Sequence, residues 1–73
     1  MIENLRTAKY VSDLLLNING QLLESIGNVE KDCSPDEFII YRRRVGTLVN
    51  SIFEQILEPI YDRHPTLKPP GLE

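Results

Sequence analysis

The chain has 73 residues, 41% of them hydrophobic and 26% charged, so it forms at most one small domain of ordinary composition. Its net charge of −3 gives the whole molecule no electrostatic attraction to nucleic acid or to anionic membrane. One cysteine excludes an internal disulfide framework, and neither a secretory leader pattern nor an apolar run of about 18 residues is present. We therefore expect a cytoplasmic protein with no membrane partner.

A first helix is predicted from about residue 3 to about residue 30. Apolar residues recur there at spacings of three and four, which places them on one face: Ala8, Val11, Leu15, Ile18, Leu22, Ile26 and Val29. Gly20 and Gly27 each cost about 1 kcal/mol relative to Ala inside a helix, so an earlier end at Gly27 is an open alternative. Because Val29 keeps the period, we favour continuation to Glu30.

The strongest local signal is a helix start at Ser34. Ser34 and Glu37 have the spacing of a capping box, in which each satisfies a backbone N–H of the other. Pro35 falls at the first helical position, where its missing N–H is harmless. Asp36 and Glu37 place negative charge at the positive end of the helix dipole. These residues predict a second helix over about residues 35–61.

The second helix has one broad apolar face. Its members are Phe38, Tyr41, Val45, Leu48, Val49, Ile52, Phe53, Ile56 and Ile60, with Ile39 and Leu57 on the edge. Pro59 removes a backbone hydrogen bond and clashes with the preceding turn, so we expect a kink or an end there. His64 precedes a proline, which disfavours further helix.

Only residues 31–33 separate the two helices, and so short a connection predicts an antiparallel hairpin over residues 1–63. Residues 64–73 contain three prolines and no apolar period, which predicts an extended, polyproline-like tail. We interpret the last two residues, Leu72 and Glu73, as a candidate cloning remnant and base nothing on them.

Each predicted helix has an apolar face wider than the seam between two helices. A lone hairpin would leave much of this surface in water, and large apolar patches usually mark an interface. The sequence therefore predicts an all-α homodimeric four-helix bundle built from two hairpins. The predicted interface consists of Phe38, Tyr41, Val45, Leu48, Val49, Ile52, Phe53, Ile56, Leu15, Ile18 and Leu22. The competing hypothesis is that the hairpin docks on a different protein.

Arg42, Arg43 and Arg44 form the only run of charge and are candidate contacts to a ligand or partner. Arg43 and Arg44 fall on the polar side of the second helix, whereas Arg42 falls inside the apolar arc. Arg42 therefore either lies along apolar surface with its charge in water or pairs with a carboxylate, for which Glu24 is the candidate. The acidic total and the absence of Trp make nucleic acid the less favoured partner.

No residue set for catalysis, cofactor binding or metal binding is apparent. Glu54 and Glu58 face outward, and the single histidine, His64, lies beyond the helix, so no metal or cofactor is expected. Cys33 precedes a helix N-terminus, where the pKa of a thiol can be lowered, but no base lies near it in the sequence.

We therefore expect a non-enzymatic interaction or regulatory module that acts as a homodimer. One alternative is a dimeric regulator that binds RNA or another nucleic acid through Arg42, Arg43 and Arg44. A third hypothesis is an enzyme with Cys33 as its nucleophile.

Overall fold

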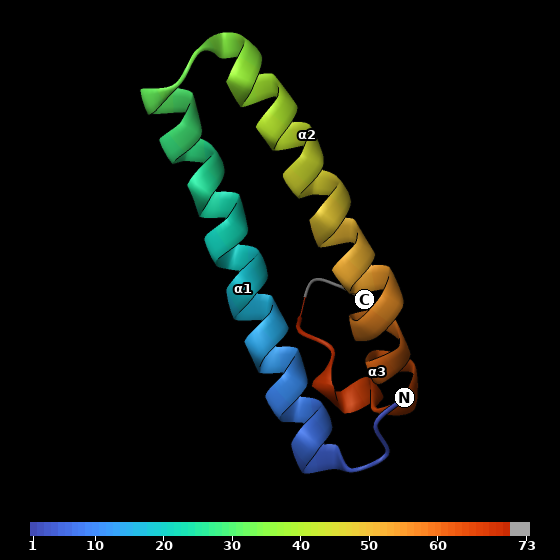
Figure 1. Cartoon of the computed structure of the whole chain (residues 1–73). Coiled ribbons are helices and arrows are strands. Elements are labelled where there is room, and N and C mark those ends of the chain that lie inside the picture. The colour runs from blue at the N-terminus through green and yellow to red at the C-terminus, as the bar shows by residue number, and fades with distance from the viewer. Residues whose placement is uncertain (71–73) are drawn as a thin grey trace.

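The computed structural model describes residues 1–70, and every regular element in that range is helical. Two long helices, α1 (Leu5–Asp32) and α2 (Pro35–Ile52), run antiparallel and are joined by a short turn (Figure 1). A π-helical turn, η1 (Phe53–Leu57), follows, then helix α3 (Glu58–Arg63) and a 3-10 turn, η2 (Pro65–Leu67). The hairpin is elongated, with extents of 44 × 20 × 16 Å. The prediction of an all-α helical hairpin is confirmed.

Helix α1 begins after Asn4, whose side chain accepts a hydrogen bond of 3.0 Å from the backbone N–H of Thr7. It continues through Gly27 and ends at Asp32, where the Cys33 N–H bonds to the carbonyl of Val29. Open space lies beside the α-carbon of Gly27, so packing does not require a glycine there. Ile26 and Val29, the apolar residues of its last two turns, are partly buried.

Helix α2 begins where its cap residues predict. The Ser34 hydroxyl accepts from the backbone N–H of Glu37 at 3.2 Å and lies 3.1 Å from the Glu37 carboxylate, to which it donates. Pro35 occupies the first turn, and Asp36 adds a second acidic side chain there. The Glu37 side chain thus bonds to the Ser34 hydroxyl instead of the predicted backbone N–H.

The irregularity predicted near Pro59 takes the form of η1. At its end the Glu58 N–H bonds to the carbonyl of Phe53, five residues back, instead of four. Pro59 has no N–H, and its ring would clash with the carbonyl of Gln55 in a regular helix; a wider turn before it relieves that conflict. The segment predicted as a helix over about residues 35–61 is thus divided into α2, which ends at Ile52, η1, and α3, which ends at Arg63.

The segment after α3 folds back toward the start of the chain. The ring nitrogen Nε2 of His64 lies 2.8 Å from the carbonyl oxygen of Ile2, and Arg63 forms an exposed ion pair of 3.6 Å with Glu3. Residues 65–67 form η2 instead of the fully extended conformation that was predicted, with Leu67 packed against the core. The proposed remnant at residues 72–73 lies outside the described residues.

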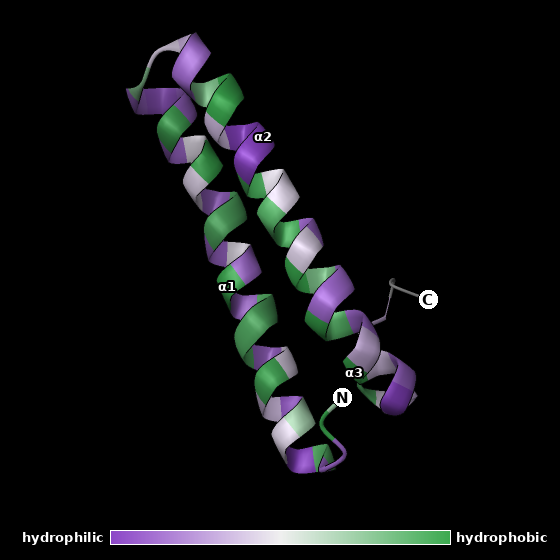
Figure 2. Cartoon of the chain, turned by 45° about the vertical axis from the view of Figure 1, so that its right-hand side comes forward, coloured by the Kyte–Doolittle hydropathy of each residue, from purple (hydrophilic) through white to green (hydrophobic). Residues whose placement is uncertain are grey.

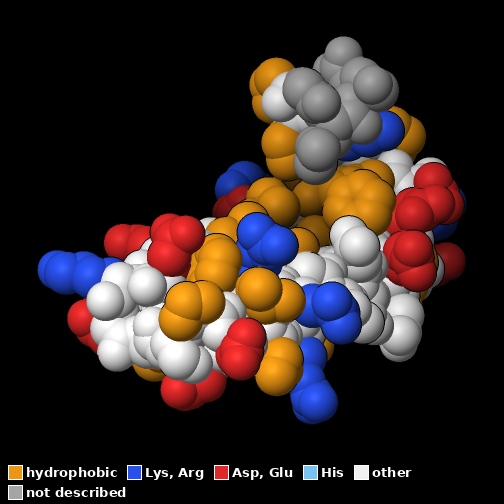
Figure 3. Space-filling model, turned by 90° about the horizontal axis from the view of Figure 1, so that it is seen from above, with side chains coloured by type: hydrophobic (Ala, Val, Ile, Leu, Met, Phe, Trp, Pro, Cys, Tyr) orange, Lys and Arg blue, Asp and Glu red, His pale blue; other side chains and the backbone are white. Residues whose placement is uncertain are grey.

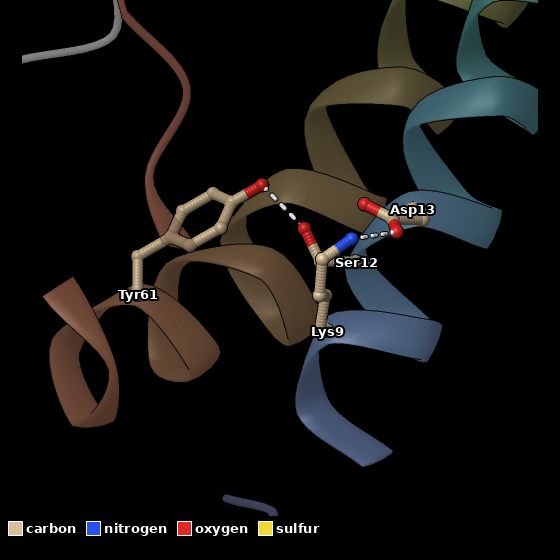
Figure 4. Close-up of polar contacts among 4 residues, drawn as sticks. All are labelled: Lys9, Ser12, Asp13 and Tyr61. Atoms are coloured by element: carbon tan, nitrogen blue, oxygen red, sulfur yellow. Dashed lines mark hydrogen bonds and ion pairs between the residues drawn. The ribbon is translucent and has the colours of Figure 1, made fainter. Parts of the chain in front are cut away.

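The hydrophobic core lies at the end of the hairpin where the two termini meet. Its buried members are Ala8, Leu57, Ile60 and Tyr61. The Ser12 and Tyr61 hydroxyls form a buried hydrogen bond of 2.9 Å between α1 and α3 (Figure 4). Hydrophobic and hydrophilic residues alternate along both long helices (Figure 2), yet toward the turn only Asn19 and Val45 are buried among the described residues.

Candidate interaction surface

Large hydrophobic side chains remain exposed on two opposite sides of the hairpin. We call the first side the Leu48 face; it contains Leu14, Ile18, Ile40 and Leu48, which are 44%, 37%, 52% and 49% exposed. The second side, the Leu23 face, contains Leu5, Leu23 and Ile39. We assigned the residues to the two sides from the 100° step of an α-helix. The hydrogen bond between Ser25 and Tyr41 shows which side of α1 and which side of α2 belong to the same face of the hairpin.

A shallow apolar groove of about 350 Å³ lies on the Leu48 face near the turn. It is lined by Val29, Cys33, Glu37, Ile40, Tyr41 and Arg44. The hydroxyls of Ser25 and Tyr41 are 2.6 Å apart beside it, and Ser25 also donates to the Leu22 carbonyl. The groove therefore has a largely apolar floor, with the paired hydroxyls of Ser25 and Tyr41 beside it and the exposed Arg44 at its edge.

A second hollow of about 490 Å³ lies farther along α2, lined by Arg43, Arg44, Thr47, Leu48 and Ser51. Arg44 lines both hollows, so they form one continuous surface along α2. Seen from the turn end, hydrophobic side chains reach the surface with basic side chains among them (Figure 3). Such a surface offers apolar contact together with positive charge.

The residues predicted for the interface divide into three groups. Val45 is buried within the single chain. Most are half-buried between the helices or at the core: Phe38, Tyr41, Val49, Ile52, Phe53, Ile56, Leu15 and Leu22. Ile18 and Leu48 remain exposed. The broad arc predicted as an interface is thus largely used inside the hairpin, and its exposed flank offers the free surface.

Ile40 was missed because it falls more than 90° from the centre of the predicted apolar arc. It lies two turns before Leu48 on the same flank of α2, and Arg44 lies between them. The sequence signal that could have identified Ile40 is its i, i+4, i+8 spacing with Arg44 and Leu48, which forms a narrow stripe beside the broad apolar face of α2.

Arg42, Arg43 and Arg44 are all exposed. The guanidinium of Arg42 lies over the ring of Phe38, 5.1 Å from its centroid, a cation–π contact. Among the described residues the ion pairs are Lys9 with Asp13 (Figure 4) and Arg63 with Glu3. The predicted pair of Arg42 with Glu24 is therefore wrong: Arg42 covers an aromatic ring while its charge stays in water.

Asn19 is the one polar side chain buried midway along the seam of the described hairpin, with 9% exposure. Its Oδ1 atom is buried and accepts no hydrogen bond from the described residues. A polar side chain such as this one is ordinarily expected at the surface. Its position one turn after Leu15 on the inward face of α1 could have identified it as a seam residue.

The residues considered for catalysis do not come together. Cys33 is exposed at the turn, whereas His64 contacts Ile2 at the opposite end of the hairpin (Figure 1). Glu54 and Glu58 are both exposed. Within residues 1–70, no cluster of three His, Cys, Asp or Glu side chains could hold a metal ion. The geometry therefore assembles neither a Cys–His pair nor a set of metal ligands.

None of the described helices combines the length and the apolar composition needed to cross a membrane. Comparison with protein-family models, curated proteins and solved structures finds no match to this chain.

Proposed function

We propose that this chain acts as a small, non-enzymatic interaction module, in which two hairpins form a homodimeric four-helix bundle. The observation that carries the proposal is the row of exposed hydrophobic side chains on one side of both long helices. Leu48 and Ile40 on α2 are about half exposed in the single hairpin, and Ile18 and Leu14 are exposed on the same side of α1. A second hairpin laid on this face would remove all four from water.

The position of the core supports the same proposal. The buried cluster occupies one end, so the remaining length of α1 and α2 is joined by a single seam. A chain of this size has little core to offset its conformational entropy, and association is a common remedy. The exposed Cys33 fits a reducing compartment such as the cytoplasm.

The variant Leu48→Glu tests the dimer. Burial of an unpaired carboxylate would raise the dissociation constant by about 100-fold or more. Because Leu48 is half exposed in one hairpin, the variant chain keeps its helices as a monomer, which circular dichroism and sedimentation equilibrium together detect. The matched control, Asn17→Glu, adds the same charge at an exposed position on α1 and leaves the mass unchanged. Equal masses for both variants and the unmodified chain would contradict the proposal.

A dimer that binds nucleic acid is the second candidate, favoured by the exposure of all three arginines and by Arg43 and Arg44 lining one hollow. The net charge of −3 makes it the weaker candidate. It predicts RNA binding that falls steeply with salt and is lost in the double variant Arg43→Ala, Arg44→Ala. Fluorescence anisotropy with a labelled RNA oligonucleotide measures this, and equal binding by the double variant would remove the candidate.

A further inference from the structure

Basic and acidic side chains are separated along α2 and the segment that follows it. Arg42, Arg43 and Arg44 lie in the middle of α2, after the acidic Asp36 and Glu37 of its first turn, whereas Glu54 lies in η1 and Glu58 begins α3; all of them are exposed. Arg44 and Glu54 are ten residues apart, which is about 15 Å along a helix, so they cannot pair within one chain. The surface between them is the hollow that contains Leu48.

We infer that this surface binds a second copy of the same chain, with the two α2 helices antiparallel across a two-fold axis near the middle of the hollow. An antiparallel arrangement places the arginines of each α2 over the segment that follows α2 in the other copy, where Glu54 and Glu58 lie, whereas a parallel contact of the two α2 helices would stack arginine on arginine. Arg44 then lies beside Glu54 of the second copy, twice by symmetry. This inference rests on the proposed homodimer and specifies its face and its direction.

The side chains at the centre of the hollow suit close approach of a second helix. Thr47 and Ser51 are small and one turn apart, and Leu48 lies between them with 49% of its surface exposed. The Thr47 hydroxyl donates to the Arg43 carbonyl at 3.2 Å, and Ser51 Oγ accepts from Gln55 Nε2 at 2.7 Å. Because both hydroxyl oxygens already form a hydrogen bond along their own helix, covering them costs less than covering unpaired hydroxyls would.

The Leu23 face lacks this complementarity. The basic group nearest to its exposed residues on α2 is Arg42, whose guanidinium already lies over Phe38. The Leu48 face is therefore the one whose charges complement those of a second copy related by a two-fold rotation.

Charge reversal tests the inference. We expect Arg44→Glu and Glu54→Arg each to raise the dimer dissociation constant about tenfold at low salt, and the double variant to return it close to the unmodified value. Because the two residues cannot meet within one chain, a rescue reports contact between chains. Sedimentation equilibrium gives the constants. The control Arg6→Glu makes the same charge change on the exposed back of α1 and has no effect.

The outcomes separate this inference from the homodimer itself. If the unmodified chain is a dimer but both single variants dimerise as it does, the antiparallel α2 contact is wrong and the homodimer stands. If both single variants weaken the dimer and the double variant weakens it further, the charges do not face each other and the inference also fails. If the unmodified chain is a monomer throughout, the proposed function and the inference fail together.

Discussion

The two ends of the hairpin differ in how their apolar residues are used. At the terminal end, α1, η1, α3 and η2 surround Leu57 and Ile60, neither of which has any exposed surface. Toward the turn only two helices are present, and neighbouring leucines and isoleucines remain about half exposed. The difference indicates that the terminal end supplies the stability of the single chain, while the middle and the turn end supply surface for association.

Among variants that compare the two ends, Leu57→Ala has the largest expected effect on the free energy of unfolding. Removal of a fully buried leucine side chain lowers the free energy of unfolding by about 2 to 5 kcal/mol. Leu23→Ala, at a position 51% exposed, changes it by only about 0.5 kcal/mol. Urea denaturation at one fixed protein concentration measures both variants. Equal losses would mean that the two ends contribute alike to stability.

The two serine–tyrosine hydrogen bonds allow a matched comparison of the ends. Tyr61→Phe leaves the hydroxyl of Ser12 buried without a partner and lowers the free energy of unfolding by about 1 to 3 kcal/mol. Tyr41→Phe has a smaller effect, about 0.5 to 1 kcal/mol, because Ser25 is only partly buried and keeps its bond to the Leu22 carbonyl. The same denaturation experiment applies, and a larger loss for Tyr41→Phe would reverse the proposed ranking of the two ends.

Asn19→Leu has the smallest expected effect on the free energy of unfolding, and it is expected to stabilise the chain where the other variants destabilise it. Replacing a buried side chain that leaves Oδ1 unpaired with an apolar one of similar size raises the free energy of unfolding by about 1 kcal/mol. Asn17→Leu, at an exposed position two residues earlier, leaves it unchanged. A decrease for Asn19→Leu would show that the amide has a partner in solution, which would place a polar contact within the thin seam.

Local chemistry made part of this fold predictable from the sequence. The start of α2 follows from Ser34, Pro35 and Glu37, because a cap acts on residues within one turn. The hairpin follows from the apolar period of both helices and the short connection between them. Neither inference needs knowledge of how distant parts of the chain pack.

The remaining features depend on tertiary packing. Pro59 indicates a disturbance, but only the folded chain shows that it is absorbed by η1, a turn one residue wider than an α turn. Leu57, the last residue of this turn, was predicted at the edge of the apolar face and is fully buried. The sequence also identified the apolar side of α2, but only the packing of the folded chain shows which residues of that side remain exposed to solvent.

The most direct test of the account is the mass of the unmodified chain by sedimentation equilibrium over a wide range of concentration. The account predicts a dimer of two 8.4 kDa chains that dissociates only on dilution. A helical species of 8.4 kDa at every concentration would contradict it, because the Leu48 face would then be free in solution.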